Sequence, residues 1–272
     1  MRRLRAMSQL ARRWWAALLL LVLALLAAGR SINLSSLPFT SDETWTRVHR
    51  QGVLRVGTDA SYPPLASLSN DGTFVGLDVD LARAIAEAMN VDLELANIHW
   101  DGLLGALQAG RIDMIISAMP YDGTLTRDVA FSTAYADLGL VLVASVENSQ
   151  PDDWASARVA VELGSEAHLY VRRLGQERAP VRLVIVDHVD DLLTPLIEGS
   201  ADVAICDRIT GGQLAADSRL KMILPPLVSE PVYVVTARDA PRLIAEVDSI
   251  IANLVATDEL QRMNHRWLGG EE

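Results

Sequence analysis

The chain has 272 residues, half of them apolar, which is enough for one large or two modest domains and excludes a wholly disordered protein. The formal net charge is −11, and residues 31–272 alone hold 18 basic and 35 acidic residues, because six arginines lie in the first thirty. So acidic a chain argues against nucleic acid and anionic membrane surfaces as partners. With Cys206 as the one cysteine and no ligand spacing among five histidines, we expect no disulfide, no metal site and no cofactor.

The first thirty residues have the composition of an export signal. Five arginines precede an uncharged stretch from Trp14 to Gly29 that ends in small residues. This stretch of about sixteen residues is shorter than the roughly 20 residues of a transmembrane helix. We therefore expect residues 1–30 to be a signal peptide or a retained N-terminal anchor, and the Ser-rich residues 31–51 to be a linker. The protein is expected to be exported, either periplasmic or on the outer face of the cytoplasmic membrane.

Strands and helices alternate along the next part of the chain. The hydrophobic pattern predicts strands at 53–57, 91–95 and 112–116, helices at 78–89 and 101–109, and a hairpin turn at Asn70-Asp71-Gly72. This order is typical of an α/β layer, in which the loops after the strands form the binding surface.

The alternation then starts again. Apolar runs predict strands at 138–143, 158–161, 181–186, 201–205 and 231–235, and helical periodicity marks 166–174, 190–198, 241–254 and a shorter stretch around 260–267. From the pattern alone, the two sets could form one doubly wound domain or two separate lobes.

The segment GLDVDLARAIAEAM at residues 76–89 carries the most information in the chain. By its pattern it is an amphipathic helix with acids at its start, where N-terminal caps are stabilising. Its residue pattern also resembles the segment that marks the family 3 bacterial solute-binding proteins. These are the extracytoplasmic receptors that deliver polar amino acids to ABC importers.

The resemblance covers residues 53–268 and implies a fold. That fold is the type II periplasmic-binding-protein fold: two α/β lobes joined by two hinge crossings, with the ligand in the cleft between them. It places the crossings near 141–146 and 230–236. The implied lobes are residues 52–144 plus 232–272 and residues 145–231.

The resemblance also implies residues for an aromatic sandwich and for the ligand ammonium. Asp59 and Tyr62 lie in the loop DASYPP, and Trp100 begins WDGLLGAL. Asp207 ends ADVAICD, which looks like the family strand that carries the ammonium-binding acid. The alternatives are a core position for Trp100 and a helix cap for Asp207.

The residues expected to hold the ligand carboxylate depart from the family pattern. Ser165 fits a helix start that binds anions, but Glu166 places an acid beside it. Ala118 and Pro120 stand where relatives have polar contacts, and Pro120 has no N–H to donate. The family arginine corresponds without gaps to Leu125. Arg127 in Thr-Leu-Thr-Arg could replace it, or could be a solvated loop residue.

These features predict a non-catalytic, monomeric receptor that closes on a polar amino acid or a related amine and docks on an ABC permease. A ligand other than an ordinary amino acid is credible because the arginine is uncertain. The alternatives are a membrane-tethered ligand sensor, a periplasmic lyase similar to cyclohexadienyl dehydratase, and a domain that binds nothing.

Overall fold

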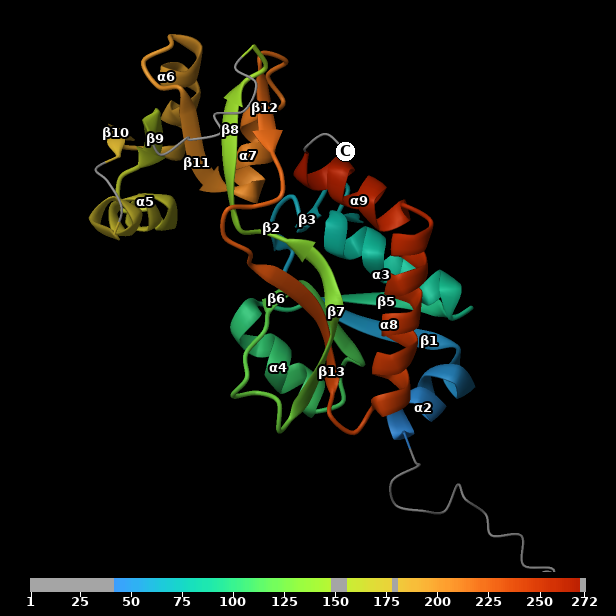
Figure 1. The fold of residues 1–272 in the computed structure, drawn as a ribbon. Coiled ribbons are helices and arrows are strands. Elements are labelled where there is room, and N and C mark those ends of the chain that lie inside the picture. Colours follow the sequence, from blue (N-terminus) through green and yellow to red (C-terminus); the bar gives the residue numbers. More distant parts are fainter. Residues whose placement is uncertain (1–41, 148–155, 178–180, 270–272) are drawn as a thin grey trace, which may run out of the picture. The chain divides into compact units, whose positions relative to one another are not determined.

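The computed structural model describes residues 42–147, 156–177 and 181–269 (Figure 1). The expected export segment and most of the expected linker lie outside the described residues. Residues 43–51 of that linker form helix α2 (Glu43–Gln51) instead. The Oδ1 atom of Asp42 accepts the Trp45 N–H at 2.7 Å and caps the helix, and its Oδ2 atom accepts the Arg242 N–H at 2.8 Å. The helix therefore belongs to the folded protein, because its cap also holds the start of another helix.

The first sheet has the strand order β5-β1-β6-β13-β7. Its strands are β1 (Val53–Thr58), β5 (Asp92–Asn97), β6 (Met114–Pro120), β7 (Val129–Asp137) and β13 (Pro231–Ala237). The first three in this order are parallel, and β13 runs antiparallel to both of its neighbours. The carboxyl ends of β1 and β6 therefore meet at one edge of the sheet, where binding loops are expected.

Helices cover both faces of this sheet (Figure 1). One face packs against α3 (Leu77–Ala88), α8 (Pro241–Ala256) and α9 (Glu259–Leu268), and the other against α4 (Trp100–Gln108). Ile116 and Val234 lie in the first core, whereas their neighbours Ile115 and Val235 lie in the second. Burial on both faces explains why the predicted strands read as nearly continuous apolar runs.

The second sheet has the order β10-β9-β11-β8-β12. Its strands are β8 (Leu140–Ser145), β9 (Arg158–Glu162), β10 (Arg182–Val186), β11 (Val203–Asp207) and β12 (Leu220–Ile223). Its helices are α5 (Glu166–Glu177), the short η3 (Val189–Leu192), α6 (Leu193–Ile197) and α7 (Arg208–Leu214). Two separate cores, one on each face, hold these helices to the sheet. The chain thus builds two α/β lobes.

A small three-stranded sheet, β2-β3-β4, precedes α3. It consists of β2 (Ser61–Tyr62), β3 (Ala66–Leu68) and β4 (Phe74–Val75), and the expected hairpin turn at residues 70–72 joins the last two strands. Gly76 then has a φ of 136°, and a Cβ atom there would lie 2.1 Å from the Leu65 carbonyl oxygen. The glycine that begins the family-like segment is therefore required by the backbone.

The two acids of that segment have separate structural roles. Asp78 is only 2% exposed, and its carboxylate accepts hydrogen bonds from the Tyr135 hydroxyl at 2.7 Å and from the Ala118 N–H at 3.1 Å. Asp80 instead accepts the Trp267 Nε1–H at 2.8 Å and pairs with Arg266, both on α9. The first acid thus ties α3 to the sheet, and the second ties α3 to the last helix.

The chain crosses between the lobes at residues 138–139 and again just before β13. Residues 140–145 pair with β11 and β12, so the first crossing precedes the expected region 141–146, and residues 140–144 belong to the second lobe. The two crossing segments touch: the Leu138 N–H donates to the Glu230 carbonyl at 3.0 Å, and a Cβ on Gly139 would lie 1.8 Å from the Val228 oxygen. Only glycine fits at this point of the hinge.

A further contact between the lobes lies at the end of α9. A Cβ atom on Gly212 of α7 would lie 2.2 Å from the Leu268 oxygen, and one on Gly269 would lie 3.0 Å from the Gly212 Cα. The backbones of α7 and of the end of α9 therefore touch directly, without an intervening side chain. Among the described residues, none of the helices combines the length and apolar character needed to cross a membrane.

Candidate functional site

Asp59 organises the first-lobe edge where the aromatic residues lie. It directly follows β1, and its Oδ2 atom accepts the Trp100 N–H at 2.8 Å while Oδ1 accepts the Ser61 N–H and hydroxyl at 3.1 and 2.7 Å. The hydrogen bond from the Ser61 side chain, with help from the backbone bonds, lowers the pKa of Asp59. Both carboxylate oxygens are thus occupied within the protein, and Asp59 acts by positioning the β1–β2 loop against the start of α4.

Tyr62 and Trp100 stand out from this edge. Their exposed fractions are 50% and 39%, so part of each aromatic residue is open to a ligand. The pKa of Tyr62 is raised, first by partial burial and then by the negative charges of Asp207, Glu230 and Asp78. The tyrosine therefore lies in a field of carboxylates that come from both lobes and from the crossing segment.

The other first-lobe positions offer no free donor. Ala118 has the left-handed φ of 46°, and its N–H already donates to Asp78 and to the Tyr135 hydroxyl oxygen, each at 3.1 Å. Pro120 is exposed at the end of β6 and has no N–H. Burial raises the pKa of Asp78 to about 6, although the hydrogen bonds from Tyr135 and Ala118 oppose this shift.

Arg127 lies at the opposite end of the first sheet. It is exposed two residues before Val129, which pairs with Ala237, whereas Pro120 pairs with Val232 near the other end of β13. Leu125 packs against the core under α4. The structure therefore does not group Arg127 with the other expected site residues, and the gapless family position is an apolar packing residue.

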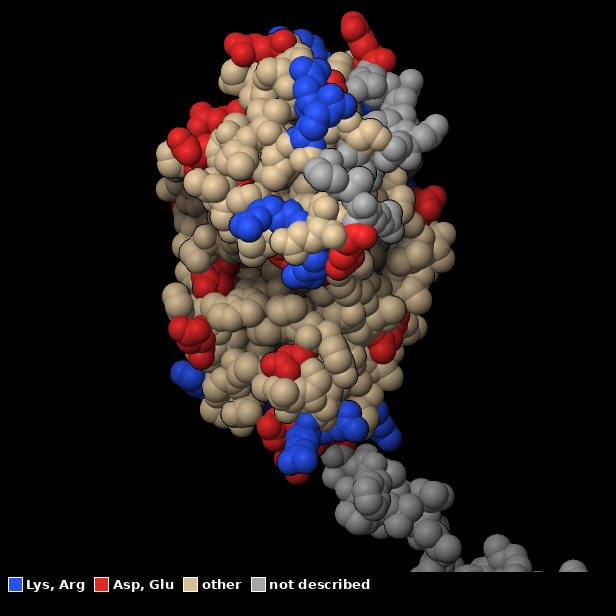
Figure 2. Space-filling model, turned by 60° about the vertical axis from the view of Figure 1, so that its left-hand side comes forward, with Lys and Arg blue, Asp and Glu red and all other residues tan. Residues whose placement is uncertain are grey.

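A second-lobe pocket of about 70 Å³ lies after β9 and β11, where four acids are the charged residues in its described lining. On the face seen in Figure 2, by contrast, acidic and basic side chains are interspersed. The described lining of the pocket differs from that face in holding no basic residue. The acids are Glu162, Glu166, Asp207 and Glu230.

Asp207 and Ser165 each start a helix at this pocket. The Asp207 carboxylate accepts the Thr210 N–H at 3.0 Å and the Thr210 hydroxyl at 2.7 Å, yet the residue remains exposed. It is a helix cap that also faces the pocket, so the two interpretations of this residue are compatible. The Ser165 hydroxyl accepts the His168 N–H at 3.1 Å and donates to the Glu162 carbonyl at 2.8 Å. Its hydrogen bonds therefore serve the start of α5.

Glu230 is a site residue that sequence reasoning missed. It directly precedes β13 in the second crossing and lines the pocket together with Glu166. The pKa of Glu230 is raised, first by burial and then by the charge and hydrogen bond of Glu166, with smaller effects of Asp137 and Asp207. Its position beside Pro231 at an expected crossing was the one available signal.

Comparison with known proteins agrees with this geometry. Residues 54–270 match the profile of the bacterial extracellular solute-binding proteins, family 3. The chain belongs to this family. The family 3 receptor fold, with two lobes and paired hinge segments, is therefore the framework in which the acidic pocket and the aromatic edge are placed.

Named relatives of this family 3 receptor are binding proteins. The L-cystine-binding protein TcyJ of Escherichia coli K12 is 25% identical over 252 residues, which cover 90% of this chain and 92% of that protein. The ABC transporter arginine-binding protein 1 of the same strain is 22% identical over 79% of this chain and 90% of its own length.

A solved structure has the same fold. The L-cystine solute receptor of Neisseria gonorrhoeae, in its unliganded open conformation, superposes with a TM-score of 0.72 and 24% identity, over 83% of this chain and 97% of that one. The expected type II periplasmic-binding-protein fold is thus confirmed.

Proposed function

We propose that this family 3 receptor binds a small amine-bearing molecule, either a polar amino acid or a related amine, and delivers it to an ABC permease. The observation that carries this proposal is the second-lobe pocket, whose described charged lining consists of four acids. The named relatives bind L-cystine and arginine, which both carry an ammonium group, and one is described as part of an ABC transporter.

The chemistry of the pocket favours a cation. A buried ammonium must exchange its hydration shell for charged or polar acceptors, since an unpaired buried charge costs several kcal/mol. Asp207, Glu166 and Glu230 supply such acceptors. On the first lobe, Tyr62 and Trp100 are partly exposed aromatic residues, and a cation over an aromatic face gains about 0.5–2 kcal/mol.

The same geometry disfavours a ligand carboxylate. The Ala118 N–H is already used, Pro120 has none, and Arg127 lies at the other end of its sheet. A carboxylate at the start of α5 would meet the Glu166–Glu230 pair. We therefore infer that an amine without an α-carboxylate binds at least as well as the corresponding amino acid.

Hinge closure would bring the aromatic edge and the acidic pocket onto opposite sides of the ligand, so that the closed form is the one the permease recognises. All of these side chains come from one chain, so a monomer suffices. The dehydratase alternative is disfavoured because its carboxylate substrates need a cationic group that the described pocket lining does not contain. Cleavage of residues 1–30 or their retention as an anchor is compatible with this role.

Matched ligand pairs test the proposal. Isothermal titration of the full-length protein would compare arginine with agmatine, lysine with cadaverine, and histidine with histamine, each pair differing by the α-carboxylate. We expect saturable binding of at least one amine, with an affinity equal to or above that of its amino acid. Binding of amino acids alone would overturn the amine preference but keep the receptor role. If none of the six compounds bound, both the amine preference and the receptor role would be overturned.

A further inference from the structure

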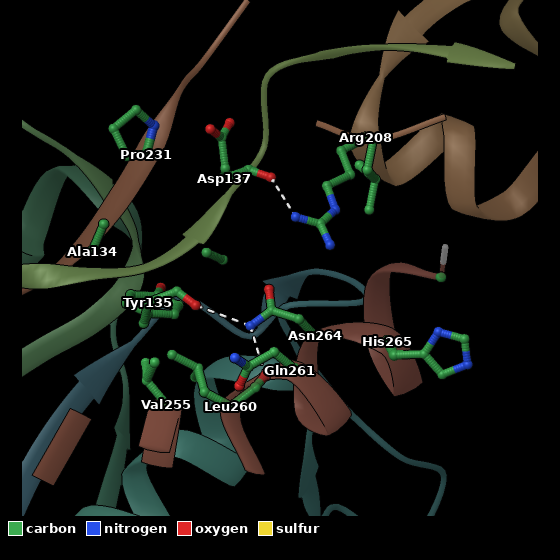
Figure 3. A pocket seen from close by; sticks show the side chains of 13 residues that line it. Ala134, Tyr135, Asp137, Arg208, Pro231, Val255, Leu260, Gln261, Asn264 and His265 are labelled. Atoms are coloured by element: carbon green, nitrogen blue, oxygen red, sulfur yellow. Dashed lines mark hydrogen bonds between the residues drawn. The ribbon is translucent and has the colours of Figure 1, made fainter. Parts of the chain in front are cut away.

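A second cavity lies behind the hinge, away from the acidic pocket. Figure 3 shows it between the crossing strands, the start of α7 and the helix α9. Its volume is about 430 Å³, within the range of roughly 300–1,000 Å³ that small-molecule sites occupy. It shares no lining residue with the acidic pocket.

Arg208 is the charged group that faces this cavity without an ionic partner. Its Nη1 atom donates to the Asp137 carbonyl oxygen at 3.2 Å, its Nε atom is buried without a partner, and it forms no ion pair with a described residue. In Figure 3 its other terminal nitrogen points into the cavity, toward the side of Asn264. Burial lowers the pKa of Arg208 because the cation is partly removed from water.

The nearby carboxylate does not neutralise this guanidinium directly. Asp137 turns its side chain to the crossing segments, where it accepts the Gly139 N–H at 3.0 Å, the Glu230 N–H at 2.8 Å and the Ser229 hydroxyl at 2.6 Å. Burial is the largest influence on the pKa of Asp137 and raises it, but these bonds and the charge of Arg208 outweigh burial and lower it. A partly buried cation bonded to a neutral carbonyl thus remains available to an anion.

The rest of the lining defines the kind of anion. Apolar side chains form much of the wall, with Gln261, Asn264 and His265 on one side. Such a cavity suits a charged head on an apolar body better than a fully hydrated inorganic ion. The apolar members are Ala134, Ala136, Leu224, Pro231, Val255 and Leu260.

We propose that this cavity is a binding site for a small organic carboxylate, held by the Arg208 guanidinium against the apolar wall of α8 and α9. Arg208 begins α7 of the second lobe, whereas Val255 and Leu260 belong to the first lobe. An occupant therefore contacts both lobes and changes the affinity of the cleft for its own ligand. This coupling rests on the proposed function, whereas carboxylate binding does not.

Isothermal titration of the full-length protein with butyrate and benzoate tests the site, with 1-butanol and inorganic sulfate as comparison solutes. We expect saturable binding of at least one carboxylate, none of butanol, and weaker binding of sulfate. Arg208→Met should weaken carboxylate binding about 10- to 100-fold, the usual value of a charge-assisted hydrogen bond. Arg173→Met, on the exposed side of α5, is the matched control and should leave it unchanged.

A second variant guards against a general effect of losing Arg208. Val255→Trp places a large ring at the rim of the cavity and keeps the guanidinium, and we expect it to block the carboxylate while circular dichroism stays native. Absence of saturable carboxylate binding, or equal affinity in folded Arg208→Met, would overturn the proposal. Equal affinities for sulfate and benzoate would overturn the claim that the site prefers an organic carboxylate to an inorganic anion. An affinity for the cleft ligand that is the same with and without saturating benzoate would overturn only the coupling.

Discussion

Asp207 and Arg208 are consecutive residues, yet their side chains line two different cavities. Asp207 faces the acidic pocket and caps α7, and Arg208 begins the same helix and faces the cavity behind the hinge. The start of α7 thus presents a carboxylate to the acidic pocket and a guanidinium to the cavity behind the hinge. Any rotation of α7 that moves one of these groups also moves the other, so the two cavities are mechanically linked.

Replacing Asp207 by Asn separates its two roles. Asn is also a good N-cap, so the free energy of unfolding should change by less than about 0.5 kcal/mol. Loss of the charge should weaken binding of a cationic cleft ligand about 10- to 100-fold. Urea unfolding and isothermal titration measure the two effects. Asp239→Asn, exposed just after β13, is the control. A folded Asp207→Asn protein with unchanged affinity would remove Asp207 from the site.

The affinity for a cationic ligand should depend on the ionisation of Glu230. The pKa of Glu230 is raised by burial and by Glu166, so at pH values below this raised pKa the free receptor holds a proton that a cation must displace. Affinity should therefore rise as the pH increases through this raised pKa, and binding below it should release a proton. Titration in buffers of different ionisation enthalpy measures that release. Glu230→Gln should flatten the profile, and Glu198→Gln, exposed after α6, should not.

Asp78 should make the folded state less stable as the pH rises. Its pKa is about 6 in the folded protein against 3.8 ordinarily, so the folded state holds the proton more tightly. The free energy of unfolding should consequently fall by up to about 3 kcal/mol between the ordinary and the raised pKa. In Asp78→Asn this fall is absent. Urea unfolding at several pH values measures the difference between the two proteins, with exposed Asp92→Asn as the control. A difference that does not change with pH would refute the effect.

Gly139 should tolerate no side chain. Since a Cβ there would lie 1.8 Å from the Val228 oxygen, Gly139→Ala must push the crossing segments apart, and we expect a loss of about 1–3 kcal/mol in unfolding free energy together with weaker cleft binding. Gly105 in α4 has open space at its Cβ, so Gly105→Ala should stabilise the protein by about 0.5–1 kcal/mol. Equal stability of the two variants would show that the crossings need not pass so closely.

Most elements of the first and second α/β sets could be predicted because their apolar periodicity is local. The strand pattern at 53–57 and the helix pattern at 78–89, for example, correspond to β1 and α3 within about two residues. The sheet to which an apolar strand belongs is not local information. Residues 140–144 are apolar and suit either lobe, and their pairing with β11, some sixty residues later, decides the matter. The strand β7 was not predicted, because its apolar and polar residues alternate only weakly and its pairing with β13 lies about a hundred residues further along the chain.

The candidate site was predictable only where it follows a strand directly. Ser165 and Glu166 come soon after β9, Asp207 ends the neighbouring strand β11, and the structure brings all three to one pocket. Glu230 reaches that pocket from the other end of a crossing, so no short pattern marks it. The sequence left open whether Arg127 is a ligand residue. The length of the loop before β7, which returns to the far end of the sheet, determines its position.

The meeting of Gly212 with Leu268 and Gly269 bears on how the lobes move. Besides the two covalent crossings, the lobes share this close backbone contact, and beside it Ile209 of α7 packs against the core of the first lobe. The contact leaves no room between the two backbones, so it limits how α7 can move against the end of α9 when the lobes close. A methyl group on either glycine would collide with the facing backbone and so hinder the movement of α7 against the end of α9. Movement of the lobes would then depend on a backbone contact, in addition to the charged groups of the two cavities.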